Sequence, residues 1–224
     1  NVWDELDEYR LRRWKHAAGV MLKPALTFVD MGAYSDAVAD FVKPRQTANN
    51  RVYACKGFEY LNRPGLVDES TGKKHKVRLF RIGTVTGKDR ILSRLQAPRP
   101  EPGKVGANYM HFPLVQIVDE HGQKVKVPLP TEYFRQLTAE TKIPVVDKRT
   151  RRTRFLYAMN HERNEILDLT VYAHAARVAL QTIIDPKTYG DLKALHKKIC
   201  EEREVPQTLV KLPGRRQISA GVQV

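Results

Sequence analysis

Apolar and polar positions fall into blocks that predict helices and strands in turn. Apolar residues stand near helical spacing, with charges between them, in Val2–Ala17, which predicts an amphipathic helix. The short apolar run Ala25–Asp30 predicts a buried strand that ends in an acid, and Tyr34–Val42 predicts a short helix that Pro44 ends. A second strand, Arg51–Lys56, completes a strand–helix–strand unit, which favours parallel strands joined by a right-handed crossover.

The rest of the chain predicts further elements separated by polar loops. Strands are expected at Val77–Ile82 and Asn108–Pro113, with a hairpin over Val115–Val127. Helices are expected over Lys88–Gln96, Pro130–Glu140, His161–Ile184 and Lys187–Glu204. Loops are expected at Gly57–Lys76 and Ala97–Gly106, and the tail Leu212–Val224 is expected to be mobile. This order predicts an α/β fold with a central mixed sheet flanked by helices over residues 1–184, followed by a C-terminal helix and a flexible basic tail over 185–224.

The charge balance indicates the kind of partner. The formal net charge is +14 and the sequence pI about 9.8, which favours a polyanion, and nucleic acid before an anionic membrane surface. No apolar run is long enough to span a membrane, and Asn1–Tyr9 is acidic where a signal peptide is basic and then apolar. Cys55 and Cys200 stand far apart, with no metal-ligand spacing around them, so we expect a reducing cytoplasm and no structural zinc.

The densest basic run lies between two predicted strands. It consists of Lys148, Arg149, Arg151, Arg152 and Arg154. A hairpin with this charge could lie along the DNA backbone, and the alternative is a solvated loop. No base-reading motif accompanies the arginines, so they predict affinity and not sequence readout.

Two acids stand where a metal site would need them. Asp30 ends a predicted strand beside Gly32, and ligands gather at the carboxyl ends of strands in open α/β sheets. Asp168 opens a helix that is apolar on nearly every face, so its burial must be offset by the helix dipole, by Arg163 or by a divalent cation. Glu165 lies on the same face and is the alternative ligand if the helix is rotated. The simpler interpretation makes Asp30 a turn residue and Asp168 a helix-opening acid.

Together the two acids predict hard oxygen ligation of Mg²⁺ or Mn²⁺. In a two-metal nuclease, such carboxylates converge from distant parts of the chain and hold ions that activate water and stabilise the leaving oxygen of a phosphodiester.

Six segments in order resemble the GpA type of phage terminase large subunits. Residues 163–180, RNEILDLTVYAHAARVAL, are similar to the family signature RNEALD-x-x-VYALAA. The others are VDMGAYSDAV at 29–38, ACKG at 54–57, IGTVTGKDRILSRL at 82–95, YMHFP at 109–113 and QLTAE at 136–140. The resemblance covers Thr27 to Leu180.

The resemblance implies an RNase H-like, metal-dependent endonuclease domain that cuts concatemeric double-stranded DNA during packaging. It implies that Asp30 and Asp168 are the metal ligands of a two-metal Mg²⁺ or Mn²⁺ site, with Glu165 as the further catalytic candidate. In the intact protein it implies the small terminase subunit and the portal or procapsid as partners, and the cytoplasm of the bacterial host as the location. Lys56 and Lys88 match family positions and would contact phosphate, and the alternative makes them surface lysines.

Some features depart from the family pattern. The family fold begins with strands, the first of which carries another metal-binding Asp, whereas the residues before Asp30 predict a helix. We therefore expect an RNase H-like domain that lacks its first strands. Ala33 replaces the second Gly of the strand-end motif, and no GxxxxGK[ST] phosphate-binding loop occurs. The competing hypothesis is a catalytically incomplete fragment that binds DNA or packaging proteins, and a weaker one is a transposase- or resolvase-like nuclease.

Overall fold

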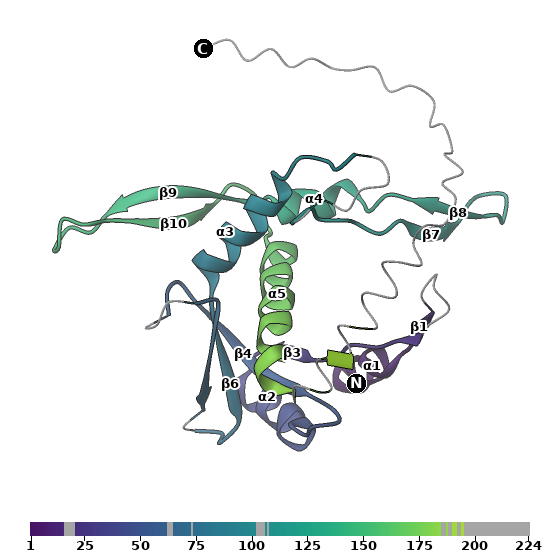
Figure 1. Ribbon diagram of the computed structural model, residues 1–224, viewed down its shortest axis with the longest axis horizontal. Helices are drawn as coiled ribbons and strands as arrows, with labels where there is room; N and C mark the ends of the chain where they lie inside the picture. The colour runs from purple at the N-terminus through teal and green to yellow at the C-terminus, as the bar shows by residue number, and fades with distance from the viewer. Residues whose placement is uncertain are drawn as a thin grey trace, which may run out of the picture.

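The centre of the molecule is a mixed four-stranded sheet (Figure 1). The computed structural model describes residues 1–15, 21–61, 65–72, 74–101, 106, 108–184, 187, 190, 191 and 194. The sheet has the order β3 (Thr27–Asp30), β4 (Val52–Phe58), β6 (Arg78–Gly83), β5 (Val67–Thr71). The first three strands are parallel and β5 is antiparallel to β6. The predicted α/β class, with its mixed sheet flanked by helices, is confirmed.

The remaining elements surround this sheet. The helices are α1 (Val2–Leu11), α2 (Ser35–Val42), α3 (Thr84–Leu95), α4 (Thr131–Leu137) and α5 (Glu165–Ile183), with a 3-10 turn η1 at Lys43–Arg45. Three further pairs of strands are β1 (Trp14–Lys15) with β2 (Met21–Leu22), β7 (Val115–Val118) with β8 (Lys124–Val127), and β9 (Glu140–Val146) with β10 (Thr153–Met159). Among the described residues, no helix is both long and apolar enough to cross a membrane.

Strand β4 divides its side chains between two cores. Val52 and Ala54 join a cluster with the apolar residues of α2, whereas Tyr53 and Cys55 join the cluster formed by α5. This follows from the alternation of side chains along a strand. Helices therefore cover both faces of the sheet, and the predicted strand–helix–strand unit around α2 is confirmed as parallel.

The largest departure from the sequence prediction is β5, because the stretch Gly57–Lys76 was expected to be a loop. Val67 pairs with Ile82 across the antiparallel ladder, and the preceding Leu66 is buried in the main core. The Pro and Gly residues that favoured a loop lie before and after this short strand and not within it. An edge strand of five residues carries too weak an alternation to stand out between such turn residues.

Several boundaries also differ from the prediction. Helix α1 ends at Leu11, because Arg12 adopts an extended conformation there. Helix α3 begins at Thr84, earlier than predicted, and α5 begins at Glu165, after an irregular turn at His161. No strand forms at Asn108–Pro113, where the segment has no ladder partner.

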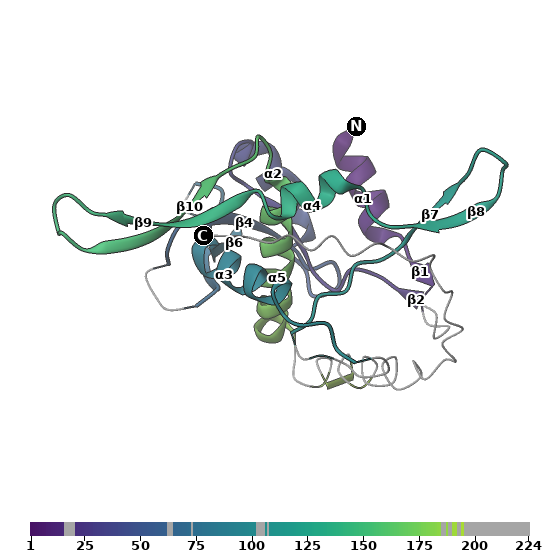
Figure 2. The ribbon, with the colours of Figure 1, turned by 90° about the horizontal axis from the view of Figure 1, so that it is seen from above.

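Two hairpins project from the body in opposite directions, as both views show (Figures 1 and 2). The hairpin of β7 and β8 matches the hairpin predicted over Val115–Val127. Strands β9 and β10 are the two strands predicted on either side of the basic run, but β9 begins at Glu140, which was expected to end a helix; that helix, α4, ends at Leu137. The basic run lies at the far end of the second hairpin. The predicted helix at Lys187–Glu204 and the tail fall outside the described residues, apart from four helical positions.

Candidate functional site

Asp30 lies at the carboxyl end of β3, next to the central strand β4. Its Cα pairs with that of Cys55, and Met31 donates its backbone N–H to the Cys55 carbonyl at 2.8 Å. The Gly32 N–H donates to Asp30 Oδ1 at 2.9 Å, so the turn after the strand fixes one oxygen of an exposed carboxylate. The other carboxylate oxygen remains available to a ligand, as expected at this edge of an α/β sheet.

A glycine allows α3 to approach α5 closely enough for their side chains to meet. A Cβ added at Gly87 would lie 2.3 Å from Val171 Cγ1, well inside van der Waals contact. Val171 is fully buried. Only a residue without a side chain fits at this crossing, and the next residue, Lys88, is thereby held beside the first turn of α5.

Lys88 joins two carboxylates from different elements. Its Nζ lies 2.6 Å from Glu140 Oε1 at the start of β9 and 3.1 Å from Asp168 Oδ1 on α5. Asn164, which precedes α5, donates from Nδ2 to Glu140 Oε1 at 2.6 Å and to Asp168 Oδ2 at 3.2 Å. We call these four residues, Lys88, Glu140, Asn164 and Asp168, the lysine–carboxylate cluster.

The lysine–carboxylate cluster is largely removed from water. The side chains of Lys88 and Glu140 are 10% and 3% exposed, whereas that of Asp168 is 35% exposed. Asp168 Oδ1 is buried, and beyond the ionic contact with Lys88 the described part of the chain gives it no hydrogen-bond donor. One buried cation thus faces two carboxylates, which leaves the cluster with a net negative charge and an under-satisfied oxygen.

Asp30 lies close enough to this cluster to affect it electrostatically. Burial raises the pKa of Asp168, the ammonium of Lys88 lowers it, and the charges of Glu140 and Asp30 raise it again. Burial also raises the pKa of Tyr172, and the charges of Asp30, Cys55 and Asp168 add to that effect. The charge of Asp30 therefore reaches Asp168, and both acids act on the same tyrosine, Tyr172.

Glu165 is not brought to this group. It is exposed and receives a hydrogen bond from Arg163 Nε at 3.1 Å. Its pKa is lowered, chiefly by a backbone N–H hydrogen bond, with burial raising it and Arg163 lowering it further. The first turn of α5 therefore presents Asp168 toward Lys88 and Glu165 toward solvent.

The predicted DNA-contacting residues lie in different settings. Lys56 is exposed on β4, and Arg163 is exposed beside the start of α5. Lys148, Arg149, Arg151, Arg152 and Arg154 are exposed on the second hairpin. Lys88 differs from both interpretations offered by the sequence, because it is buried and bound to carboxylates. A direct contact of Lys88 with phosphate stays a prediction and would require the side chain to leave Glu140 and Asp168.

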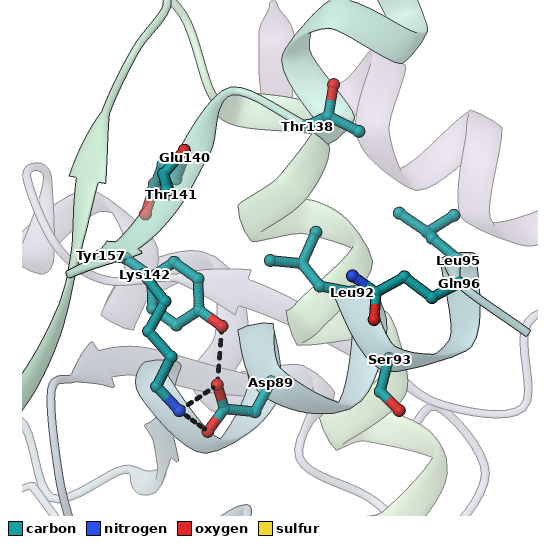
Figure 3. Close-up of a pocket in the computed structure, with 10 residues that line it drawn as sticks. All are labelled: Asp89, Leu92, Ser93, Leu95, Gln96, Thr138, Glu140, Thr141, Lys142 and Tyr157. Atoms are coloured by element: carbon teal, nitrogen blue, oxygen red, sulfur yellow. Dashed lines mark hydrogen bonds and ion pairs between the residues drawn. The ribbon is translucent and has the colours of Figure 1, made fainter. Parts of the chain in front are cut away.

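The basic hairpin is attached to the same helix that carries Lys88. Asp89 accepts hydrogen bonds from Tyr157 Oη at 2.7 Å and from Lys142 Nζ at 2.9 Å (Figure 3). These residues line a cavity of about 540 Å³ at the base of the hairpin. Lys88 and Asp89, which are consecutive in α3, thus bind Glu140 and Lys142 of β9. Helix α3 therefore holds both the lysine–carboxylate cluster and the base of the hairpin.

An Asp89→Ala variant is expected to loosen the hairpin while leaving the central sheet intact. The variant leaves the half-buried Tyr157 hydroxyl without its acceptor, which typically costs about 1–3 kcal/mol. The exposed contact with Lys142 adds little. Amide hydrogen exchange should become faster in β9 and β10 and remain unchanged in β3 and β4. Equal acceleration in both places, or none in the hairpin, would contradict this assignment.

Glu140 is the residue that sequence reasoning missed. It lies in the QLTAE segment at 136–140, one of the six segments that resemble the family. The available signal was an acid that directly follows Ala139, close to Leu137, both of which are buried. A carboxylate beside buried apolar residues needs a partner that offsets the cost of its own burial. Nothing in the sequence spacing named that partner as Lys88.

The donor set fits a divalent cation in part. Carboxylate oxygens suit Mg²⁺ and Mn²⁺, and among the described residues the buried Asp168 Oδ1 has only the Lys88 ammonium, 3.1 Å away, as a partner. Within the described residues, no group of three or more His, Cys, Asp or Glu side chains is placed to hold a metal ion. Mg²⁺ is commonly bound by one or two protein carboxylates together with water and substrate phosphate, so a site with fewer than three protein ligands is compatible with this ion.

Comparison with known proteins gives one family and one relative. The model of the family described as "Terminase large subunit gpA, endonuclease domain" matches residues 1–185. The curated "Terminase, large subunit" of Enterobacteria phage P21 is 26% identical over 215 residues. That match covers 94% of this chain and 30% of the relative, so the chain spans less than a third of the relative's length. No solved structure matches.

Proposed function

The chain belongs to the endonuclease domain family of the terminase large subunit gpA, and from this premise we propose that it cuts concatemeric double-stranded DNA during phage DNA packaging in a metal-dependent reaction. The proposal is supported by Asp30 standing at the carboxyl end of the parallel strand β3 while its charge acts on Asp168 of α5, a residue from a distant part of the sequence. We also propose that the fold of this domain is RNase H-like.

Asp30 and Asp168 would hold Mg²⁺ or Mn²⁺. When bound, such an ion polarises a phosphate oxygen and lowers the pKa of a coordinated water. The residues of this chain orient the ligands. Gly32 holds one oxygen of Asp30, whereas Asn164 and Lys88 fix the two oxygens of Asp168.

The partners proposed for the whole protein follow from the same family. Double-stranded DNA is the substrate, and the exposed lysine and arginines of the second hairpin are proposed to contact its backbone. The small terminase subunit and the portal or procapsid are proposed as partners of the longer protein, in the cytoplasm of the bacterial host. The net charge of +14 supports a polyanionic substrate.

A second candidate is a DNA-binding module that does not cut by itself. It is favoured by the absence of a cluster of three metal-binding side chains among the residues that the structure describes. In that case Asp30 and Asp168 need a further carboxylate before an ion is held tightly.

Titration with Mn²⁺ in an isothermal calorimeter separates these candidates. We expect the chain to bind Mn²⁺, and Asp168→Asn and Asp30→Asn to lower the affinity by about tenfold or more, because each removes a charged ligand. Glu165→Gln is the matched control on the same helix turn and should leave the affinity unchanged. A loss in Glu165→Gln without a loss in Asp168→Asn would reassign the ligand, and no binding by the parent chain would favour the non-cutting module.

A further inference from the structure

A second polar cleft lies between α3 and α5, outside the group formed by Asp30 and the lysine–carboxylate cluster. Its volume is about 710 Å³, and its lining includes Arg90 and Arg94 of α3 with His174 and Arg177 of α5. A neighbouring hollow of about 360 Å³ is lined by Arg94 and Arg177 as well. The two helices therefore place three guanidinium groups around one depression of the surface.

The acid that lines this cleft is already occupied. Asp89 binds Lys142 and Tyr157 of the second hairpin. Among the described residues, Asp89 is the only acid in the lining of the cleft, against three arginines. The net charge of the lining is therefore positive.

The pKa of His174 is affected by burial and by the positive charge of the arginines around the cleft. Burial lowers its pKa to about 4, and the charges of Arg94, Arg90 and Arg177 contribute to that shift. The imidazole is therefore neutral at pH 7. Its Nδ1 lies 3.4 Å from Arg94 Nη1, and because a guanidinium only donates, Nδ1 is the acceptor. The proton of the neutral ring then sits on Nε2.

The Nε2–H donor of His174 lacks an acceptor. This nitrogen is buried and has no hydrogen-bond partner in the described part of the chain, and the whole residue is only 8% exposed. Buried donors are rarely left unpaired in folded proteins, because each costs about 1–3 kcal/mol. The two ring nitrogens point in widely different directions, so Nε2 faces away from Arg94 and is not a donor to the cleft. An anion entering beside Arg94 would instead bring negative charge and acceptor oxygens to the arginines.

We propose that this cleft binds a phosphate group of the nucleic-acid backbone. Guanidinium groups match phosphate oxygens in charge and in planar, two-point geometry, whereas His174 holds Arg94 in place through Nδ1. The cleft shares Asp89 with the cavity at the base of the basic hairpin, so a duplex on the hairpin passes beside it. This proposal rests on the proposed DNA substrate and adds a contact that the cutting reaction itself does not require.

Duplex binding at several salt concentrations, measured by fluorescence anisotropy in EDTA so that no cutting occurs, tests the proposal. The variant Arg90→Gln/Arg177→Gln removes two exposed arginines of the cleft. It is expected to reduce the slope of log affinity against log salt by about 1 to 2, because each phosphate contact contributes about 0.9. The control Arg12→Gln/Arg13→Gln removes the same charge from exposed positions after α1 and should leave the slope near that of the parent chain. Thermal unfolding confirms that each variant is folded.

The ligand source is decided by a second titration, with inorganic phosphate. If the salt slope falls only in the cleft variant, the ligand is the backbone phosphate. If the slope is unchanged but the cleft variant loses binding of inorganic phosphate, the site takes a free phosphate group and the backbone assignment is overturned. If neither changes, the cleft is not a phosphate site. A reduced slope in a chain that does not cut plasmid would leave this inference standing and remove the proposed nuclease function.

Discussion

A Lys88→Met variant is expected to have a free energy of unfolding about 3–5 kcal/mol lower than that of the parent chain. This is the cost typical of removing one partner from a buried ion pair. Met fills nearly the same volume as Lys but carries no charge. The Glu140 side chain, which is 3% exposed, is then left buried without its cation. Asp168 loses its ionic partner at the same time. Chemical denaturation followed by circular dichroism measures the change, with the slope of unfolding free energy against denaturant checked for constancy.

Two further variants isolate the buried pair. Lys88→Met/Glu140→Gln removes both charges and is expected to recover much of the lost stability, because it leaves no unpaired charge buried in the pair. Lys74→Met breaks an ion pair with Asp36 in which both side chains are about 70% exposed, so the free energy of unfolding should change little. If Lys88→Met costs no more than Lys74→Met, the lysine–carboxylate cluster does not stabilise the fold.

The sequence was sufficient to predict helices and strands that are long or have a strong pattern of apolar residues. The unit from β3 through α2 to β4, and the long apolar helix α5, follow from runs of buried residues with clear boundaries. The acids Asp30 and Asp168 could be chosen because each stands at the end of such a run. Their approach in space was a prediction that the electrostatic coupling of Asp168 with Asp30 now supports.

The sequence was insufficient where the structure depends on pairing between distant segments. Strand β5 is fixed by its ladder with β6, and its own sequence carries little alternation. The role of Glu140 depends on Lys88 in α3 and Asn164 before α5, which no local pattern relates to it. Gly87 is required by the packing of α3 on Val171, whereas in the sequence it is simply a poor helix former.

The same limitation applies to the arginine cleft. Arg90 and Arg94 fall within one predicted helix and Arg177 within another, and their spacing in the sequence does not relate them. Only the packing of α3 against α5 places them around one depression with His174. The charge of the whole chain predicted a polyanionic partner, but not where on the surface such a partner would bind.

Loss of either carboxylate that we propose as a metal ligand is expected to slow cutting strongly. Asp30→Ala and Asp168→Ala should each lower the rate of plasmid cleavage by about two to three orders of magnitude, because a bound metal ion supplies several kcal/mol of transition-state stabilisation. Glu165→Gln, in the same first turn of α5, should cut at nearly the parent rate because its exposed carboxylate contacts Arg163 and not Lys88. The parallel measurement of DNA binding in EDTA should show no loss for any of the three.

The most direct test is therefore cleavage of supercoiled plasmid by the parent chain and these three variants in Mn²⁺, in Mg²⁺ and in EDTA. A metal-dependent nuclease should give nicked and linear products with the parent chain and Glu165→Gln in either metal. Neither Asp30→Ala nor Asp168→Ala should give these products, and no variant should cut in EDTA. A parent chain that binds the plasmid but leaves it supercoiled in both metals would rule out the proposed cutting activity and identify the chain as a DNA-binding module that needs another carboxylate to cut.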